Sequence, residues 1–498
     1  MECQFNQTNC PCLHTVIGQV QTQEQTQEVR LSDAMPDIGR ILGCWGQPLI
    51  RSKEWRSDEI AVSGGVMAWV LYLPEDATEP KCLDTWIPFQ MKWDIPQTQR
   101  DGAILASVSM KGMDCRSISA RKMMLRAGIS VFAQALEPTE VAVFAPESLP
   151  EDIEVLQMRY PVEIPQEAGE KPFLLDEEIL LSVTAGAVHK VIGCEMCPQL
   201  TEKKVLADKL VFRGICKLHL LYMTQDGEIK QATPEMPFSQ FIDLDSSFGN
   251  NALASLVILP TGMEFETGED EKLRLKCGMS AQYVVYDRIN VDVIEDAYSV
   301  SRNVTPILTE LKLPVCLEHI SQDISYGQTL HAQGQSIIDV SAYWEQPTVR
   351  QTEDTAEIQM PSQYQVLYTD ENGSLQCVTG RGEERLPLAS DGENQILPKI
   401  DYSFPRGSFQ GDSVNISGEM TMQADVFKET NIPMVTALEL GEVTQPDPNR
   451  PSIILCRMGE QRLWDLAKTY GSTVKAIEQV NGLQQMPAEG QILLVPVS

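Results

Sequence analysis

The stretch "KLHLLYMTQDGEIKQA", residues 217–232, has the pattern of a β-hairpin and decides the fold class. An alternating run leads to Asp226-Gly227, and a second run follows it. Asp-Gly is a strong turn signal, because both residues accept the positive φ angles that a tight hairpin turn requires. The stretch "VLYTDENGSLQCV", residues 366–378, repeats the pattern around Asn372-Gly373. Both stretches predict antiparallel strands.

Strand patterns continue through most of the chain. The stretch "KLRLKCGMSAQYVVY", residues 272–286, alternates polar and apolar side chains with period two, as a half-buried strand does. Long helical periodicity is scarce before residue 450. The sequence therefore predicts a mainly β protein.

An internal repeat divides this β region. "RILGC" at residue 40 recurs as "KVIGC" at residue 190, and "WVLYLP", which contains Tyr72, recurs as "HLLYMT", which contains Tyr222. "KMMLRAGISVF" at residue 122 recurs as "KLRLKCGMSAQ" at residue 272. Each pair is separated by 150 residues. Three matches at one offset indicate a tandem duplication.

A third, weaker copy follows. "SIIDV" at residue 336 and Tyr368 lie 146 residues beyond their counterparts, and "SVNISGEMTMQ" at residue 413 matches the last motif. Many short strands with turn signals are typical of β-sandwiches. We therefore predict three tandem, sandwich-like β repeats at residues 1–155, 156–312 and 313–440. The polar seams 136–152 and 301–314 are interpreted as connections between them.

The chain changes character after residue 440. Three prolines in "GEVTQPDPNRPS" predict a linker at residues 441–451, because proline interrupts both helices and central strands. The tail, residues 452–498, predicts a strand, two short helices and a strand. Leu463, Leu466, Ala467 and Tyr470 make one helix face, and Gly471 ends that helix. Ser472 is expected to cap the second helix, whose apolar face is Val474, Ile477 and Val480.

This βααβ tail resembles the LysM module over its whole length, including "LWDLAKTYG" and "TVKAIEQVNGL". The resemblance implies a groove that binds glycans containing N-acetylglucosamine. Its first loop, "GEQRL", is one residue longer than the Gly-Asp-Thr-Leu of the family, and this departure favours docking of a protein over binding of a glycan. The implied groove residues are Gly459, Glu460, Gln461, Arg462, Trp464, Asn481, Leu483, Pro487, Gly490 and Gln491.

Trp464 has two interpretations. It could stack on a sugar ring, or it could fill the small core of the tail beside Leu463. The second is favoured, because a domain of this size needs its aromatic residues inside.

Composition excludes several classes of function. The net charge of −31 over 498 residues argues against nucleic acid and against anionic membranes as partners. No apolar run is long enough to span a bilayer, and the first residues lack the pattern of a secretory signal. Thirteen cysteines, spread along the chain, fit free thiols in a reducing compartment.

No catalytic constellation stands out, so we expect a non-enzymatic protein without a cofactor. His219 lies in an alternating strand, where a structural role is expected. The pairs Cys194–Cys197 and Cys10–Cys12 are candidate zinc ligands, but they lie in different repeats and the second has the wrong spacing. Ordinary buried thiols are favoured, and no metal site is predicted.

The three repeats resemble the DUF3794 domain, also called SPOCS, of spore-coat-associated proteins. The residues that carry the resemblance are "LSDAMPDIGRIL" (31–42), "EMPFSQFIDL" (235–244) and "IEDAYSV" (294–300), and the second repeat matches best. Together with a LysM tail, they resemble coat morphogenetic proteins of endospore-forming bacteria. The resemblance implies an adaptor in the mother-cell cytoplasm around the forespore, whose tail docks on the ATPase of the coat basement layer.

Two other classes stay open from the sequence. One is a peptidoglycan-binding protein of the cortex or cell wall. The other is a component of a phage-like or contractile particle, which the SPOCS-like motifs argue against. Self-association of the chain is open as well.

Overall fold

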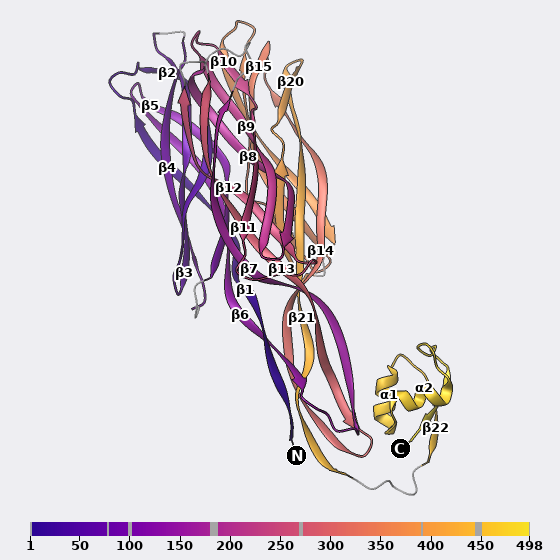
Figure 1. Ribbon diagram of the computed structural model, residues 1–498. Helices are drawn as coiled ribbons and strands as arrows, with labels where there is room; N and C mark the ends of the chain where they lie inside the picture. The colour runs from indigo at the N-terminus through magenta and orange to yellow at the C-terminus, as the bar shows by residue number, and fades with distance from the viewer. Residues whose placement is uncertain are drawn as a thin grey trace.

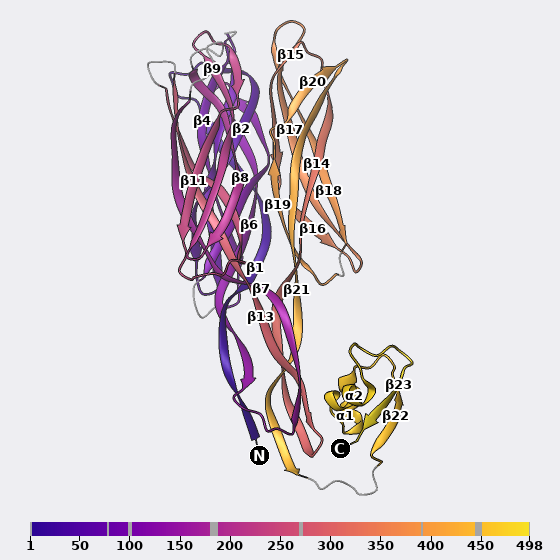
Figure 2. The same cartoon turned by 45° about the vertical axis from the view of Figure 1, so that its right-hand side comes forward.

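The computed structural model describes residues 2–76, 79–97, 102–179, 188–267, 272–389, 392–443 and 451–497. As predicted, the protein is mainly β. Figures 1 and 2 show a wide body of packed sheets, which narrows to a stalk of long strands, with the C-terminal tail beside the stalk.

Three antiparallel pairs of long strands run through both the body and the stalk, and we call them ribbons 1, 2 and 3. Each ribbon carries one or two further strands at one edge, namely β5 on ribbon 1, β12 on ribbon 2, and β19 and β20 on ribbon 3. The strands of the ribbons are β1 (Glu2–Arg30) with β6 (Lys122–Pro146), β7 (Ile153–Ile179) with β13 (Leu273–Ser299), and β14 (Arg302–His331) with β21 (Ser413–Val443). The edge strands are β5 (Ala103–Ser119), β12 (Leu253–Thr267), β19 (Gln395–Tyr402) and β20 (Arg406–Gln410).

A second sheet covers each ribbon in the body, and a hydrophobic core fills the space between them. We call a ribbon with its covering sheet a unit. Trp93, Tyr222 and Tyr364 are among the largest fully buried side chains of units 1, 2 and 3. The covering strands are β2 (Ile38–Trp55), β3 (Glu59–Pro74) and β4 (Lys81–Asp94) in unit 1, β8 (Val188–Leu206), β9 (Lys209–Thr224), β10 (Ile229–Ala232) and β11 (Glu235–Asp243) in unit 2, and β15 (Ser336–Trp344), β16 (Thr348–Gln351), β17 (Thr355–Thr369) and β18 (Leu375–Ala389) in unit 3.

The predicted hairpins are confirmed. The turn at Asp226-Gly227 joins β9 to β10, and Gly227 has a φ angle of +82°. The turn at Asn372-Gly373 joins β17 to β18, and Gly373 has a φ angle of +75°. Both glycines occupy a backbone conformation that other residues rarely adopt.

The prediction of short strands is wrong, since β21 alone has 31 residues. The polar seam at 136–152 lies within β6 as far as Pro146, and its last residues, 147–152, connect β6 to β7. The seam at 301–314 lies within β14 from Arg302 onwards, so only residues 300 and 301 connect β13 to β14. The polar residues of the strand portions of both seams face solvent in the stalk. These parts of β6 and β14 are therefore as polar as a loop would be, although they are strands. The predicted boundaries after residues 155 and 312 fall inside β7 and β14. Of the predicted linker, residues 444–450 lie outside the described residues.

The stalk has its own core, to which all three ribbons contribute. Val162 and Val293 from ribbon 2 pack with Leu311 and Ile432 from ribbon 3, and Cys12 of ribbon 1 joins them. Burial of apolar side chains therefore holds the ribbons together where no covering sheet is present.

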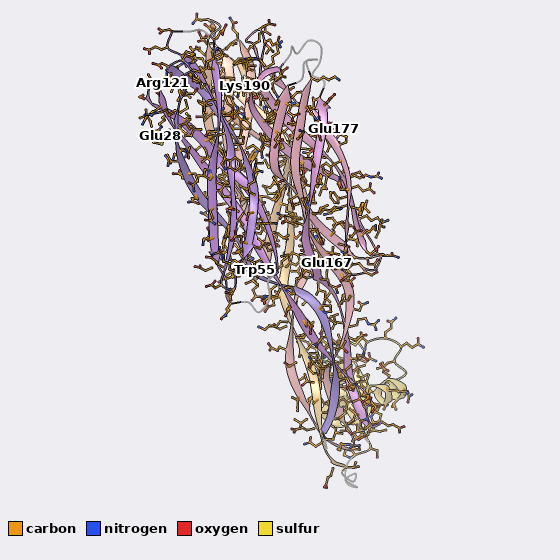
Figure 3. The ribbon with its side chains drawn as sticks, turned by 60° about the vertical axis from the view of Figure 1, so that its left-hand side comes forward. Glu28, Trp55, Arg121, Glu167, Glu177 and Lys190 are labelled. Carbon is orange, nitrogen blue, oxygen red and sulfur yellow. The ribbon has the colours of Figure 1, made fainter. Side chains whose placement is uncertain are left out.

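Side chains on the surface of the body form ion pairs between units. Lys190 of β8 contacts Asp84 of β4 at 2.7 Å, and Figure 3 shows Lys190 at the wide end of the body. Exposed pairs of this kind stabilise a protein by less than about 1 kcal/mol. Figure 3 places Trp55 and Glu167 where the body narrows.

The tail contains β22 (Ile453–Arg457), α1 (Leu463–Tyr470), α2 (Val474–Asn481) and β23 (Ile492–Pro496), in the predicted order of strand, helix, helix and strand. Gly471 ends α1 with a φ angle of +61°, as predicted. The predicted cap of α2 is wrong. Thr473 caps this helix by accepting the Ala476 N–H at 3.1 Å, because Ser472 is the buried residue that precedes it. Val480 is also 48% exposed and does not join the core.

Candidate functional site

The structure brings the two predicted groove loops of the tail together. The Met458 N–H donates to the Gln491 carbonyl at 2.8 Å, and the Gly490 N–H donates to the Met458 carbonyl at 2.7 Å. These bonds align the loop before α1 with the loop before β23. The side chains of Glu460 and Gln461, together with Gln491, are exposed there.

Glu460, Gln461 and Gln491 form an exposed strip, and the other residues of the two loops differ in exposure. Gly459 is exposed and has no neighbouring atom where a Cβ would lie, so the backbone is open to a ligand. Pro487 is half-buried, and Leu483 packs against the hydrophobic core of the tail. The exposed residues of the predicted groove therefore offer mainly backbone, amide and carboxylate groups, which suit hydrogen bonding better than apolar contact.

Asn481 serves the fold of the tail and does not face the groove. Its Nδ2 donates to the carbonyls of Ile477 at 2.8 Å and Leu494 at 2.6 Å, and its Oδ1 accepts the Leu494 N–H at 2.8 Å. The side chain thus ties the end of α2 to β23, and its hydrogen-bonding groups are used inside the tail.

Trp464 also lies away from the groove. Its side chain is 6% exposed, and the indole N–H donates to Asp296 Oδ2 at 2.9 Å. The indole ring packs edge to face against Tyr298, with ring centroids 4.8 Å apart. Trp464 is therefore buried, partly by the end of β13 in the stalk.

Further contacts complete this junction between the tail and β13. Lys468 Nζ lies 2.8 Å from both carboxylate oxygens of Asp296, and Arg462 Nη1 lies 3.6 Å from Glu295 Oε2. The Tyr298 hydroxyl donates to the Ser472 carbonyl at 2.9 Å. Burial raises the pKa of Tyr298 well above its ordinary value. The sequence does not identify Asp296 and Tyr298 as contact residues, although both belong to "IEDAYSV", one of the segments that carry the family resemblance.

A buried polar cluster joins the three units inside the body. His219 Nε2 of unit 2 lies 2.5 Å from Asp339 Oδ1 of unit 3. The Trp45 indole N–H of unit 1 lies 3.1 Å from both Asp339 Oδ2 and Ser341 Oγ. His219 was expected to be structural, and its position between units agrees with that role.

The electrostatics of this cluster favour a charged pair. Burial lowers the pKa of His219, but the charge of Asp339 and the hydrogen bond to it raise the pKa above its ordinary value. Burial raises the pKa of Asp339, but His219 and the donors Ser341 and Trp45 lower it below its ordinary value. The imidazolium and the carboxylate therefore stabilise each other's charge inside the body.

The cysteines weighed as zinc ligands do not form a site. Cys194 and Cys197 are buried in the body, whereas Cys10 and Cys12 lie on β1. Burial raises the pKa of Cys197 to about 12 and that of Cys12 to about 11, so both thiols are protonated at neutral pH. Within the described residues, no group of three or more His, Cys, Asp and Glu side chains could hold a metal ion.

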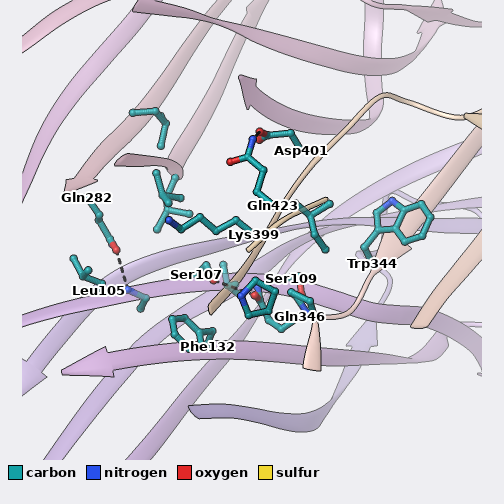
Figure 4. A pocket seen from close by; sticks show the side chains of 18 of the residues that line it. Leu105, Ser107, Ser109, Phe132, Gln282, Trp344, Gln346, Lys399, Asp401 and Gln423 are labelled. Atoms are coloured by element: carbon teal, nitrogen blue, oxygen red, sulfur yellow. Dashed lines mark hydrogen bonds between the residues drawn. The ribbon is translucent and has the colours of Figure 1, made fainter. Parts of the chain in front are cut away.

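A cavity of about 860 Å³ lies where the three units meet. Its walls include the edge strands β5, β12 and β19, one from each unit. Figure 4 shows Gln282 reaching towards β5, where its Oε1 accepts the Ala106 N–H at 2.8 Å. Lys399 pairs with Asp425 at 2.7 Å. The volume is within the range of small-molecule sites, roughly 300–1,000 Å³, but the lining mixes apolar residues with charges of both signs and singles out no ligand class.

Comparison with known families gives one assignment. Residues 187–258 match the SipL SPOCS domain. The matched segment covers β8 to β11 and the start of β12, so it contains the covering sheet of unit 2 and His219. This match supports a spore-coat SPOCS protein.

The other comparisons add no relative. No curated protein matched the chain, and no solved structure matched it. In the described part of the chain, no helix is long and apolar enough to cross a membrane.

Proposed function

We propose that this protein is a non-enzymatic adaptor in endospore coat assembly, on the mother-cell side of the forespore. The match of residues 187–258 to the SipL SPOCS domain carries this proposal. The matched segment is one covering sheet, and units 1 and 3 have covering sheets in the same place relative to their ribbons. This common order of strands supports the interpretation of all three units as tandem SPOCS repeats.

The tail is the docking head of the adaptor in this proposal. Its order of strand, helix, helix and strand, with two loops joined at Met458, supports the interpretation as a LysM module. We propose that it docks on the ATPase of the coat basement layer. Several β units in one chain would let the body contact the assembling coat at further points, and the combined affinity would exceed that of any single contact.

The chemistry of the body supports a binding role over catalysis. The polar groups that meet between the units, His219, Asp339 and Trp45, are buried and bond to each other. Such a network fixes an arrangement of units and presents no group to a substrate.

The test is cosedimentation of the purified chain with the polymerised coat ATPase. We expect the full chain to sediment with the polymer, and a chain that ends at Val443 to stay in the supernatant. Equal sedimentation of both chains would contradict docking through the tail. If neither sediments, the adaptor proposal itself fails.

Glycan binding is the alternative, and the exposed strip of Glu460, Gln461 and Gln491 favours it. It is tested by calorimetric titration of the full chain with N-acetylglucosamine oligomers. Binding that Gln461→Ala abolishes and Lys475→Ala leaves unchanged would establish the groove as a sugar site, because Lys475 is exposed on α2, outside the two loops. Absence of heat with a folded chain would exclude it.

A further inference from the structure

The junction between the tail and β13 is built around one carboxylate. Asp296 receives the indole N–H of Trp464 at 2.9 Å and the ammonium group of Lys468 at 2.8 Å. Both donors lie on α1, one turn apart, so they reach the same point beside the helix. Tyr298 covers the indole ring and reaches the end of α1 through its hydroxyl group. The face of α1 is therefore complementary to the strand segment that it covers.

A β-bulge shapes that segment. The register of β13 against β7 shifts between Ile294 and Asp296, so Glu295 is the extra residue. Neighbouring residues of a regular strand point to opposite faces, whereas a bulge turns the extra residue aside. This explains how Glu295 and Asp296 can both approach α1, where Arg462 and Lys468 lie. The segment "EDAY", residues 295–298, is thus presented in a specific shape.

Among the three ribbons, only ribbon 2 has two acidic residues at this position. By the offsets of the sequence motifs, the positions of Glu295 and Asp296 correspond to Ala145-Pro146 on β6 and to Thr436-Ala437 on β21. Neither pair carries a charge. The acidic pair therefore distinguishes ribbon 2 from ribbons 1 and 3.

The contact has a polar rim that is partly open to water, and the hydrophobic core of the tail extends onto Tyr298 and Leu156 of ribbon 2. Lys468 is 42% exposed and Arg462 is 54% exposed. Behind them, Leu466, Ala467 and Ile477 are almost fully buried between the helices and the strands of the tail. Salt screens such pairs, and their geometry does not require that tail and ribbon belong to the same chain.

We infer that the tail is an exchangeable clasp, whose α1 face binds the bulged Glu-Asp-Ala-Tyr segment of its own ribbon 2 or that of a second copy of this chain. Within one chain the covalent connection raises the effective concentration, so the intramolecular contact prevails in dilute solution. Where copies are crowded, the same contacts link one chain to the next. This inference concerns self-association and does not depend on the proposed coat partner.

The test uses two full-length variants that each lose the contact within one chain. Asp296→Lys removes the acceptor on ribbon 2 and leaves the tail intact, and Lys468→Glu damages the tail and leaves ribbon 2 intact. In a mixture, the tail of the first variant faces an unoccupied ribbon 2 on the second. We expect the weight-average mass in sedimentation equilibrium to rise with concentration towards twice the 55.5 kDa of one chain. Each variant alone should remain monomeric.

The matched control is Asp292→Lys, on the same strand but outside the junction, where Asp292 pairs with Arg159. Mixed with Lys468→Glu, it should give no dimer, since its own tail occupies its own ribbon. Limited proteolysis between body and tail reports whether the two junction variants release the tail. Released tails without a dimer in the mixture would overturn the inference, as would unchanged proteolysis in both variants. Dimerisation of the control mixture would overturn it as well.

Discussion

His219 Nε2 and Asp339 Oδ1 lie 2.5 Å apart, although they belong to different units and are separated by 120 residues. Both side chains are buried, with 4% and 0% of their surface exposed. The Gln231 amide contacts the other ring nitrogen of His219 at 3.2 Å. An ion pair in this position is sensitive to the orientation of units 2 and 3, because a buried charge without its partner is costly.

We expect the body to lose thermal stability as the pH rises from 6 to 8. The pKa of His219 is raised in the folded state. Its contribution to the stability of the fold is therefore complete below the pKa of unfolded histidine, about 6.5, and is lost as the pH rises past the pKa of the folded state. Asp339 has a lowered pKa, so its contribution is lost only in acid. The midpoint of thermal unfolding, measured in this pH window, checks the prediction.

His219→Gln is the control for this effect. Glutamine can still donate to Asp339, but it does not titrate, so the midpoint should be lower at pH 6 and should change less between pH 6 and 8. Burial raises the pKa of the nearby Glu195, and this group is the same in both proteins. An equal pH dependence of the two proteins would assign the effect to other groups.

Asn481→Ala should destabilise the tail and leave the groove loops chemically intact. The substitution removes three hydrogen bonds to Ile477 and Leu494 and leaves backbone groups of the tail unpaired. We expect a loss of roughly 2–3 kcal/mol, from about 1 kcal/mol for each bond. Faster amide exchange in α2 and β23 measures it. Gln484→Ala, at an exposed position next to Leu483, should leave the exchange rates unchanged.

Local chemistry made part of this fold readable from the sequence. The turns at Gly227 and Gly373 and the end of α1 at Gly471 need φ angles that glycine adopts at low cost, so the residue itself marks the place. The cap of α2 is predicted one residue too early, at Ser472. Serine and threonine are both good caps, and only the structure shows that Ser472 is buried.

Long-range pairing could not be read in the same way. The seam at 301–314 has polar residues and two prolines, yet β14 continues through it because β21 supplies a partner over its whole length. Trp464 was expected inside the tail, and the residue that receives its N–H, Asp296, lies 168 positions earlier. No local pattern links two such residues, so the junction had to come from the structure.

Gly373→Ala should destabilise the β17–β18 hairpin by about 1–2 kcal/mol, the cost of a left-handed conformation for a residue with a Cβ. The added methyl group meets no atom within 4 Å, so the effect isolates backbone strain from crowding. Gly249→Ala is the matched control, because that position is equally open and has no positive φ angle. Amide exchange across the hairpin should rise in the first variant only, and equal rates in both would refute a strain effect at residue 373.

Val293→Ala should loosen the stalk. Val293 is fully buried where ribbons 2 and 3 meet, beside Val162 and Ile432, so the shorter side chain leaves a void that the long strands cannot close. We expect a loss of roughly 1–3 kcal/mol from the missing methyl groups and the cavity. Met158→Ala, at a 39% exposed position on the same ribbon, should cost much less. Amide exchange in β14 and β21 of ribbon 3 is measured on both variants. It should become faster in Val293→Ala and change little in Met158→Ala, because a cavity in ribbon 2 can affect ribbon 3 only through the shared core of the stalk.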